Sequence, residues 1–272
     1  MRLPTPAFTK LLSQQFRGPI HRNINRSFYS TMMRAARYYG KEDIRVEQVP
    51  QPTVKPGQVK VSPAFVGICG TDLHEYLGGP NFCLTTPHPL TSESIPVTLG
   101  YEFSGIISEV GPDVIGFEVG QPYVVQLTLL CGHCAACHSH AENVCHTDGF
   151  VGLSGGGSGL SESIYVNVMY VFKLLEDVPL ELRALVEPLS VVWYAVLVVL
   201  EINPSSKVAI LGGGLIGLVI ILSLKAKGNF GKEFGATHIV NPIKEDLKEV
   251  ILGLINGFGA DVTFDCAGVP AR

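Results

Sequence analysis

Four of the seven cysteines lie close together in the sequence, in the pattern C-x2-C-x2-C-x7-C. Spacings this short allow several thiolates to converge on one ion, and a structural zinc ion takes four such donors in a tetrahedron. Four sulfur ligands would leave no open position for a substrate, so the pattern predicts a structural zinc site. Its ligands would be Cys131, Cys134, Cys137 and Cys145.

Two other interpretations of these cysteines remain open. Thiolates also hold iron–sulfur clusters, whose usual spacings are similar to this one without matching it. A disulfide pair with spare thiols would suit an oxidising compartment, which nothing in the sequence indicates. The same loop contains four histidines that could replace a lost thiolate, but with four cysteines present we expect them to be exposed loop residues. They are His133, His138, His140 and His146.

A glycine-rich segment further along the chain has the layout of a dinucleotide-binding turn. A short apolar run at residues 207–211 leads into G-x-G-x-x-G and then into an apolar helix that we expect to reach residue 227. In this layout the pyrophosphate rests on the helix N-terminus; the first glycine makes the tight turn, the second admits the phosphates and the third lets helix and strand pack closely. The alternative is a glycine-rich turn of another strand–helix unit. The predicted cofactor-binding residues are Gly212, Gly214, Leu215, Ile216 and Gly217.

Three further segments carry residues that could act in catalysis, although their spacing alone has no meaning. They are residues 69–74 (C-G-T-D-L-H), 100–102 (G-Y-E) and 187–190 (E-P-L-S). In this order, with the four cysteines and the glycine-rich turn, they make the chain resemble the zinc-containing medium-chain alcohol and polyol dehydrogenases. The resemblance runs from residue 33 to residue 272. Within the family the chain is most similar to the (R,R)-butanediol dehydrogenases, through residues 78–83, 86–89, 95–100 and 150–155.

The resemblance implies an α/β plus β fold in two domains. A GroES-like, β-rich catalytic domain would occupy residues 34–185, and a structural zinc lobe at residues 131–145 would project from it. We expect two strands of this domain at residues 58–64 and 105–110. A partial Rossmann domain, a doubly wound parallel sheet, would follow at residues 186–272.

The resemblance also implies a second zinc ion, with a catalytic role. Its ligands would be Cys69, Glu102 and Glu187. In the family this zinc polarises the substrate oxygen and lowers the pKa of the alcohol, so that a hydride can pass to the nicotinamide. Thr71 would accept the proton of the substrate hydroxyl. His74 would pass it to solvent, because the pKa of a histidine lies near neutrality.

Two tyrosines stand where the resemblance would place histidines. Tyr101 occupies the position of a histidine ligand of the catalytic zinc, and a phenol with a pKa of about 10 is a poor neutral ligand. Zinc could lower that pKa and recruit a phenolate, but the longer ring would need the site to rearrange. The second, Tyr194, has no role that the sequence assigns.

The nucleotide domain departs from the family pattern in its middle and at its end. After Asn229 the expected second strand is missing, together with the acidic residue that binds the ribose about 20 positions past the glycines. Glu233 lies near that position but on a helix remnant, so it is not assigned as the ribose ligand, and NAD and NADP both stay open. We expect strands at residues 237–241 and 261–265 and a helix at 244–256. The chain stops before the strands through which family members usually self-associate, so the usual dimer is not predicted.

These features predict a zinc-dependent oxidoreductase that interconverts a vicinal diol such as 2,3-butanediol and its hydroxyketone, acetoin, with NAD or NADP. A sorbitol- or xylitol-type polyol dehydrogenase is the alternative within the same class. From a different class, the alternative is a non-catalytic remnant that retains only the structural zinc. A moonlighting or quinone-reductase-like role without catalytic zinc is the third interpretation, although quinone-reductase relatives lack the four-cysteine lobe that this chain has.

Composition excludes several other classes of protein. Only 16% of the 272 residues are charged, 46% are hydrophobic and the net charge is −4, which excludes a disordered acidic tail, a coiled coil and a basic nucleic-acid binder. The longest apolar stretch, residues 208–222, contains four glycines and is shorter than the roughly 20 residues of a membrane span. We therefore expect a small-molecule substrate as the partner, and neither a nucleic acid nor a membrane.

The first 33 residues differ in charge from the rest of the chain. Residues 1–33 hold five basic residues and no acidic one, whereas the remainder carries 15 basic and 24 acidic residues. Apolar residues recur at helical spacing between residues 8 and 16, and residues 26–30 (R-S-F-Y-S) are similar to a processing site. The segment resembles a mitochondrial presequence, so we predict a mitochondrial location. The alternative is that translation starts at Met32 or Met33 and that the protein is cytoplasmic.

Overall fold

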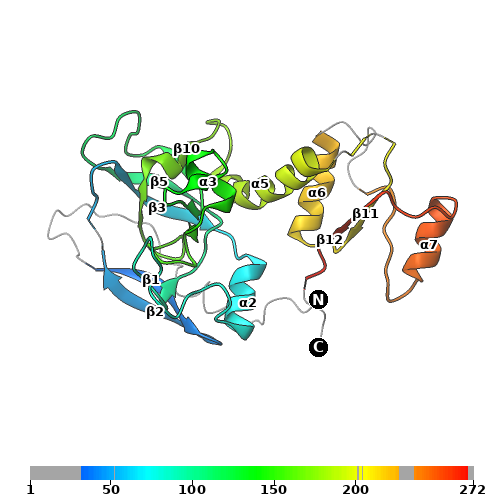
Figure 1. The fold of residues 1–272 in the computed structure, drawn as a ribbon, viewed down its shortest axis with the longest axis horizontal. Coiled ribbons are helices and arrows are strands. Elements are labelled where there is room, and N and C mark those ends of the chain that lie inside the picture. The colour runs from blue at the N-terminus through cyan, green and yellow to red at the C-terminus, as the bar shows by residue number, and fades with distance from the viewer. Residues whose placement is uncertain (1–31, 52, 201, 204, 227–235, 269–272) are drawn as a thin grey trace. The chain divides into compact units, whose positions relative to one another are not determined.

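The computed structural model describes residues 32–51, 53–200, 202–203, 205–226 and 236–268 (Figure 1). The chain divides into two compact units, Met1–Glu187 and Pro188–Arg272, so the division lies two residues beyond the predicted domain boundary. The predicted presequence lies outside the described residues, except for Met32 and Met33. These two residues belong to the first strand of the fold, β1 (Met32–Gly40), where Met33 is buried.

The first unit is built around an antiparallel sheet of five strands in the order β10-β6-β5-β3-β9. The predicted strands at residues 58–64 and 105–110 are confirmed as its two central strands, and each is slightly longer than predicted. Side chains two residues apart in a strand point to the same face, and the buried Val59 and Val61 share the inner face in this way. The strands are β3 (Gln58–Val66), β5 (Phe103–Val110), β6 (Pro122–Val125), β9 (Ile164–Asn167) and β10 (Val171–Lys173).

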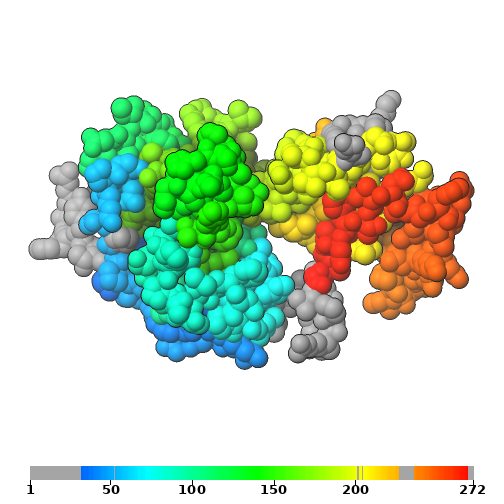
Figure 2. Space-filling model, in the orientation of Figure 1, coloured from blue at the N-terminus to red at the C-terminus, as the bar shows by residue number. Residues whose placement is uncertain are grey.

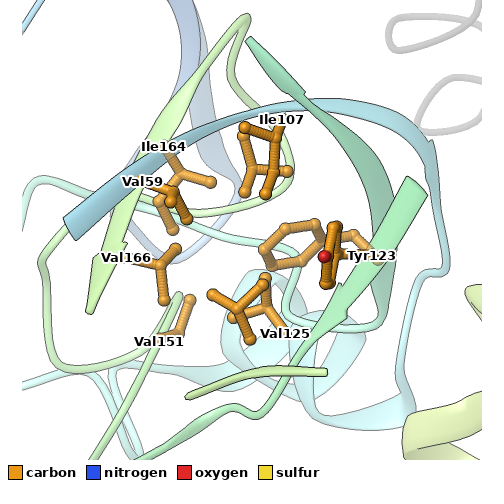
Figure 3. Packing of buried hydrophobic residues seen from close by; sticks show 10 residues of the cluster. Val59, Ile107, Tyr123, Val125, Val151, Ile164 and Val166 are labelled. Atoms are coloured by element: carbon orange, nitrogen blue, oxygen red, sulfur yellow. The ribbon is translucent and has the colours of Figure 1, made fainter. Parts of the chain in front are cut away.

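The core of this unit fills the space enclosed by these strands (Figure 3). Valine and isoleucine dominate it, because β-branched side chains pack well on a pleated surface. Each fully buried side chain of this kind contributes about 1.5–3 kcal/mol relative to an exposed one. The side chains labelled in Figure 3 are Val59, Ile107, Tyr123, Val125, Val151, Ile164 and Val166.

A second sheet and two helices complete the part of the first unit that positions the site. The sheet has the order β2-β1-β4, with β2 at Asp43–Pro50 and β4 at Val97–Thr98. The helix α2 (Gly70–Gly78) follows β3, and the short helix α4 (Leu180–Arg183) precedes Glu187.

Partly buried hydrogen bonds hold α4 against the sheet. The guanidinium of Arg183 donates to the carbonyl oxygens of Pro122, Leu175 and Val178 at 2.8–3.1 Å. The hydroxyl of Ser104 in β5 donates to the carbonyl of Leu180 at 2.6 Å. These contacts tie the segment that leads to Glu187 to β5 and β6.

The second unit contains the predicted strand–glycine turn–helix. Its described strands, β11 (Val208–Leu211) and β12 (Val262–Asp265), form a two-stranded parallel sheet, and α6 (Leu215–Ala226) follows the glycines. The helix α5 (Val186–Tyr194) begins at the end of the first unit and continues as a π-helical turn, Ala195–Val199. Apolar side chains of α5, the π-helical turn and α6 pack together with Ile202 in a small core. Its members are Val192, Val196, Ile202, Val219, Ile220 and Leu224.

The prediction of a strand at residues 237–241 is wrong. These residues form no strand, and the side chain of Ile239 is 90% exposed. A short apolar run becomes a strand only when a neighbouring strand satisfies its backbone, and in the described part of the second unit residues 237–241 pair with neither β11 nor β12. The expected strand at 261–265 is confirmed, as β12.

The helix expected at residues 244–256 is confirmed in a shorter form, α7 (Leu247–Leu254). It begins later because the side chain of Asp246 caps it by accepting from the N–H of Glu249. None of the helices in the described part of the chain has the length and apolarity that a membrane span requires.

Candidate functional site

The four cysteines of the predicted zinc lobe converge on one point. They belong to the surface segment that connects β7 (Thr128–Leu129) to β8 (Gly149–Phe150) in the sequence and is green in Figure 2. This segment also contains the helix α3 (Ala135–His138) and the 3-10 helix η1 (Glu142–Val144). The Sγ atoms lie 3.5–3.9 Å apart in four of the pairs, and all four lie within 4.8 Å of one another.

This spacing fits a single zinc ion. Sulfurs that each lie about 2.3 Å from a tetrahedral zinc are about 3.8 Å from one another. A disulfide would hold two sulfurs at about 2.05 Å, and all seven cysteines are free thiols, so the disulfide interpretation is wrong. In an iron–sulfur cluster the cysteine sulfurs bind different irons, so the cluster itself separates them. The close spacing of these four sulfurs does not fit that interpretation. The space between these four thiols accommodates one ion.

Backbone N–H groups favour the thiolate, the form that binds metal, at two of the four cysteines, whereas burial raises the pKa of a third, Cys137. Hydrogen bonds from the N–H groups of His133 and Cys134 lower the pKa of Cys131 to about 5. The N–H groups of His146 and Cys137 lower the pKa of Cys134. The prediction that the histidines of this loop are exposed is confirmed for all four of them, His133, His138, His140 and His146.

A second group of side chains surrounds the thiol of Cys69. This residue lies between the end of β3 and the start of α2, and its Sγ atom lies 3.8 Å from the hydroxyl oxygen of Thr71. Burial raises the pKa of this thiol, and the side chains of Tyr101 and Glu102, which directly precede β5, also lie near enough to influence it. The antiparallel pairing of β3 with β5 brings these two segments together, because Val66 pairs with Phe103 at the end of the ladder.

Burial and mutual repulsion perturb the acids of this group. The carboxyl of Glu102 is 4% exposed, and burial raises its pKa, although the hydrogen bond with Cys69 lowers it. Burial also raises the pKa of Glu187 to about 7, and the negative charges of Glu102 and Asp72 add to the effect. A bound cation would favour the ionised forms of such acids.

The donors near Cys69 fit the chemistry of a zinc ion. Cys69, Glu102 and Glu187 offer the sulfur and carboxylate ligands that zinc accepts. Within the described ranges, however, the four-cysteine group is the only set of three or more His, Cys, Asp or Glu side chains whose ligand atoms all lie within 4.8 Å. The predicted catalytic ligands are therefore neighbours rather than a closed set.

Tyr101 lies inside the first unit, at the position expected for a histidine ligand. Its side chain is buried in an apolar cluster with Tyr38, Leu99 and Leu153. Burial raises the pKa of the phenol, and the hydrogen bond with Cys69 raises it further. The side chain therefore contacts the Cys69 thiol as a neutral phenol.

Asp72 is a site residue that the sequence analysis did not assign. It is buried at the third position of α2, where one carboxylate oxygen accepts the N–H of Cys69 at 3.0 Å and the other faces the N–H of Gly100 at 3.4 Å. Burial raises its pKa to about 7. An acid three residues after the residue that starts a helix is the signature of a capping box, so this signal was present in the sequence.

The predicted proton path begins beside the thiol and ends at the surface. Thr71 is half-buried in the first turn of α2, and His74 is exposed. Residues three apart on a helix lie on the same side of it, so the two side chains are neighbours along α2.

The glycine-rich turn of the second unit has the geometry that its spacing predicts. Gly212 has φ +105°, and a Cβ atom there would lie 2.5 Å from the carbonyl oxygen of Cys266, so the tight turn requires glycine. A Cβ atom on Gly217 would overlap the carbonyl oxygen of Gly212, which confirms that the third glycine permits close packing of α6. Leu215 and Ile216 form the exposed first turn of α6, and Gly214 precedes them.

Two residues that the sequence left without a role keep that status. Tyr194 is the last residue of α5, and its side chain is exposed. Glu233 lies outside the described residues.

Two family models match the chain. The alcohol dehydrogenase GroES-like domain matches residues 55–176, and the zinc-binding dehydrogenase domain matches residues 209–272. The (R,R)-butanediol dehydrogenase of Bacillus subtilis is 42% identical over 255 residues, which cover 88% of this chain and 71% of the relative.

Solved structures give the same result. The crystal structure of 2R,3R-butanediol dehydrogenase from Bacillus subtilis matches with a TM-score of 0.75 at 40% identity, over 88% of this chain and 71% of that one. A putative zinc-binding dehydrogenase from Sinorhizobium meliloti, solved with NADP bound, matches with a TM-score of 0.74 at 31% identity, over the same shares of the two chains. The chain therefore belongs to the zinc-binding medium-chain alcohol dehydrogenases, a family of oxidoreductases that includes the (R,R)-butanediol dehydrogenases.

Proposed function

We propose that this protein interconverts a vicinal diol and its hydroxyketone, such as 2,3-butanediol and acetoin, with NAD or NADP as the hydride carrier. The observation that carries the proposal is the group around Cys69, in which the Thr71 hydroxyl lies 3.8 Å from the thiol and the Glu102 carboxyl lies near enough to influence the pKa of the thiol. The names of the butanediol dehydrogenases that the chain matches support the substrate class.

Cys69, Glu102 and Glu187 would hold the catalytic zinc ion. When bound, zinc acts as a Lewis acid on the substrate oxygen and lowers the pKa of the alcohol. Thr71, whose hydroxyl oxygen lies 3.8 Å from the Cys69 sulfur, would accept the proton of the substrate hydroxyl while releasing its own hydroxyl proton toward His74, which would pass it to solvent. The four cysteines of the lobe would hold a structural zinc ion.

The glycine-rich turn would bind the nucleotide. The N–H groups at the start of α6 face an anion favourably, because a helix N-terminus carries a partial positive charge. A bound nicotinamide supplies the hydride acceptor. Titration of the purified protein with NADH and with NADPH would identify the preferred nucleotide.

The function is tested with the purified full chain, zinc, NAD or NADP and a panel of alcohols. We expect turnover of 2,3-butanediol and of acetoin in the reverse direction, and slower turnover of sorbitol and xylitol. The Thr71→Ala variant should lose activity that Thr71→Ser retains, because serine keeps the proton acceptor. A folded wild-type protein without turnover would rule the proposal out, and faster turnover of sorbitol would replace it with a polyol dehydrogenase.

A second candidate is a non-catalytic protein that holds only the structural zinc, and Tyr101 is the observation that favours it. Elemental analysis separates the two: one zinc per chain indicates the remnant, and two indicate an occupied catalytic site. If the phenol alone excludes the metal, Tyr101→His should raise the zinc content from one toward two, whereas Tyr101→Phe should leave it at one.

We also propose that residues 1–33 direct the protein to mitochondria. The supporting observation is that these residues include five basic side chains and no acidic one. Fusing residues 1–33 to a fluorescent protein should send it to mitochondria, and a fusion with its arginines and lysine changed to glutamine should stay in the cytoplasm. Cytoplasmic fluorescence from the unchanged fusion would favour the alternative that translation starts at Met32 or Met33.

A further inference from the structure

Gly67 and Glu102 face each other where the two central strands of the first unit end. Val66, the last residue of β3, pairs with Phe103, the first residue of β5. One step beyond this pair, the N–H of Gly67 donates to the carbonyl oxygen of Glu102 at 2.6 Å. The backbone ladder therefore fixes residue 67 directly beside residue 102.

The side chain of Glu102 occupies the space that a side chain at position 67 would need. A Cβ atom on Gly67 would overlap the carboxylate atom Oε2 of Glu102 and would lie 3.0 Å from its Cβ and 3.4 Å from its Cδ. The backbone does not require glycine at this position, in contrast to Gly100, whose φ is +89°. Gly67 is therefore needed for space alone.

The contact matters because the same carboxyl lies beside Cys69, two residues after Gly67, near enough for the carboxyl and the thiol to influence each other's pKa. Glu102 is buried, so a displaced carboxyl would have to push into packed protein. We propose that Gly67 is a positioning residue, whose missing side chain supplies the space that holds the Glu102 carboxyl against the Cys69 thiol. The inference deepens the proposed function, on which it depends for the role of these two residues.

A double-mutant cycle tests this proposal, with Gly67→Ala, Glu102→Ala and both together. In Glu102→Ala the carboxylate is gone, so of the three atoms nearest to the new methyl group of residue 67 only the Cβ of residue 102, at 3.0 Å, remains. Gly78→Ala is the matched control, since Gly78 is exposed at the end of α2 and no atom lies within 4 Å of its Cβ position. Each variant is assayed for kcat/KM with 2,3-butanediol, for zinc per chain and for its unfolding midpoint after removal of metal.

We expect Gly67→Ala to lower kcat/KM by about 100-fold, the effect of a displacement of roughly 1 Å at a catalytic group. In the Glu102→Ala background the same change should lower kcat/KM and the unfolding midpoint much less than in wild type. Gly78→Ala should match wild type. Equal losses in both backgrounds, or wild-type kcat/KM in Gly67→Ala, would overturn the proposal.

The readouts also separate a failure of this proposal from a failure of the proposed function. If wild type has no turnover, the assigned function is wrong, but the cycle of unfolding midpoints and a crystal structure of metal-free Gly67→Ala still measure the contact. A carboxyl of Glu102 displaced from Cys69 in that structure supports the positioning role. A carboxyl that still contacts Cys69 refutes it.

Discussion

The carboxylate of Asp72 accepts the backbone N–H of Cys69 at 3.0 Å, and its second oxygen faces the N–H of Gly100 at 3.4 Å. A single buried side chain thus links the residue that carries the thiol to the residue just before Tyr101 and Glu102. Because the two segments adjoin different strands, β3 and β5, this link helps to set their separation at the site.

We therefore expect Asp72→Ala to destabilise the protein by about 2 kcal/mol, since it leaves buried N–H groups without an acceptor. The same change should lower kcat/KM, because the two segments are no longer held together. Denaturant unfolding and steady-state kinetics measure the two effects. The exposed Asp177→Asn is the control and should change stability by less than about 0.5 kcal/mol. Wild-type stability in Asp72→Ala would contradict this reading of the link.

Cys145→Ser should remove one zinc ion per chain. Cys145 is the buried member of the four-cysteine group, and a serine hydroxyl cannot replace its thiolate. The affinity of the lobe for zinc should fall by more than about 100-fold. Mutation of a residue that merely hydrogen-bonds to a metal ligand lowers affinity by up to about 100-fold, and loss of the ligand itself should cost more. Elemental analysis and thermal unfolding measure the result. Cys266→Ser, at a half-buried position beyond β12, should keep the wild-type zinc content.

Gly217→Ala should destabilise the second unit and weaken nucleotide binding. The added methyl group would overlap the carbonyl oxygen of Gly212 and push α6 away from β11. Overpacking of this kind costs about 1–3 kcal/mol. Unfolding curves and fluorescence titration with NADH test the prediction. Gly213→Ala is the control for stability, because no atom lies within 4 Å of its Cβ position; an equal loss of stability there would refute the packing argument.

The ion pair between Arg34 and Glu162 should stabilise the protein only above acidic pH. The two side chains meet at 2.8 Å, and the N–H of Arg34 donates to the same carboxylate at 2.9 Å. Partial burial raises the pKa of Glu162, but the hydrogen bonds and the charge of Arg34 together hold it below its ordinary value. The stabilisation is therefore complete above the ordinary pKa of a glutamate and is lost as the pH falls through the lowered value.

Glu162→Gln should accordingly reduce stability at about pH 7, and the reduction should shrink as the pH falls through the lowered pKa of Glu162. The difference at neutral pH should be below about 1 kcal/mol, because both side chains are more than two-fifths exposed. Urea unfolding of both proteins across this pH range measures it. A constant difference at all pH values would show that the carboxylate charge is not responsible.

The local sequence pattern was sufficient wherever one contiguous segment determines the structure. The short spacings of Cys131 to Cys145 predicted a site for one ion, because a single loop of about that length can turn four thiols toward one point. The spacing of the glycines likewise predicted a tight turn at Gly212 and a close helix–strand contact at Gly217, because both features exclude a side chain.

Pairing between distant segments could not be read from the sequence. Residues 237–241 have a strand-like composition but no strand forms there, because a strand depends on a neighbour that the local sequence does not specify. The grouping of Cys69 with Glu102 came from resemblance, and only the β3–β5 register explains it physically. The role of Gly67 likewise depends on a contact across that register. The bond from Asp72 to Cys69 is local and was signalled by the sequence, but its contact with Gly100 was not, so the tertiary structure decided which residues join the two segments.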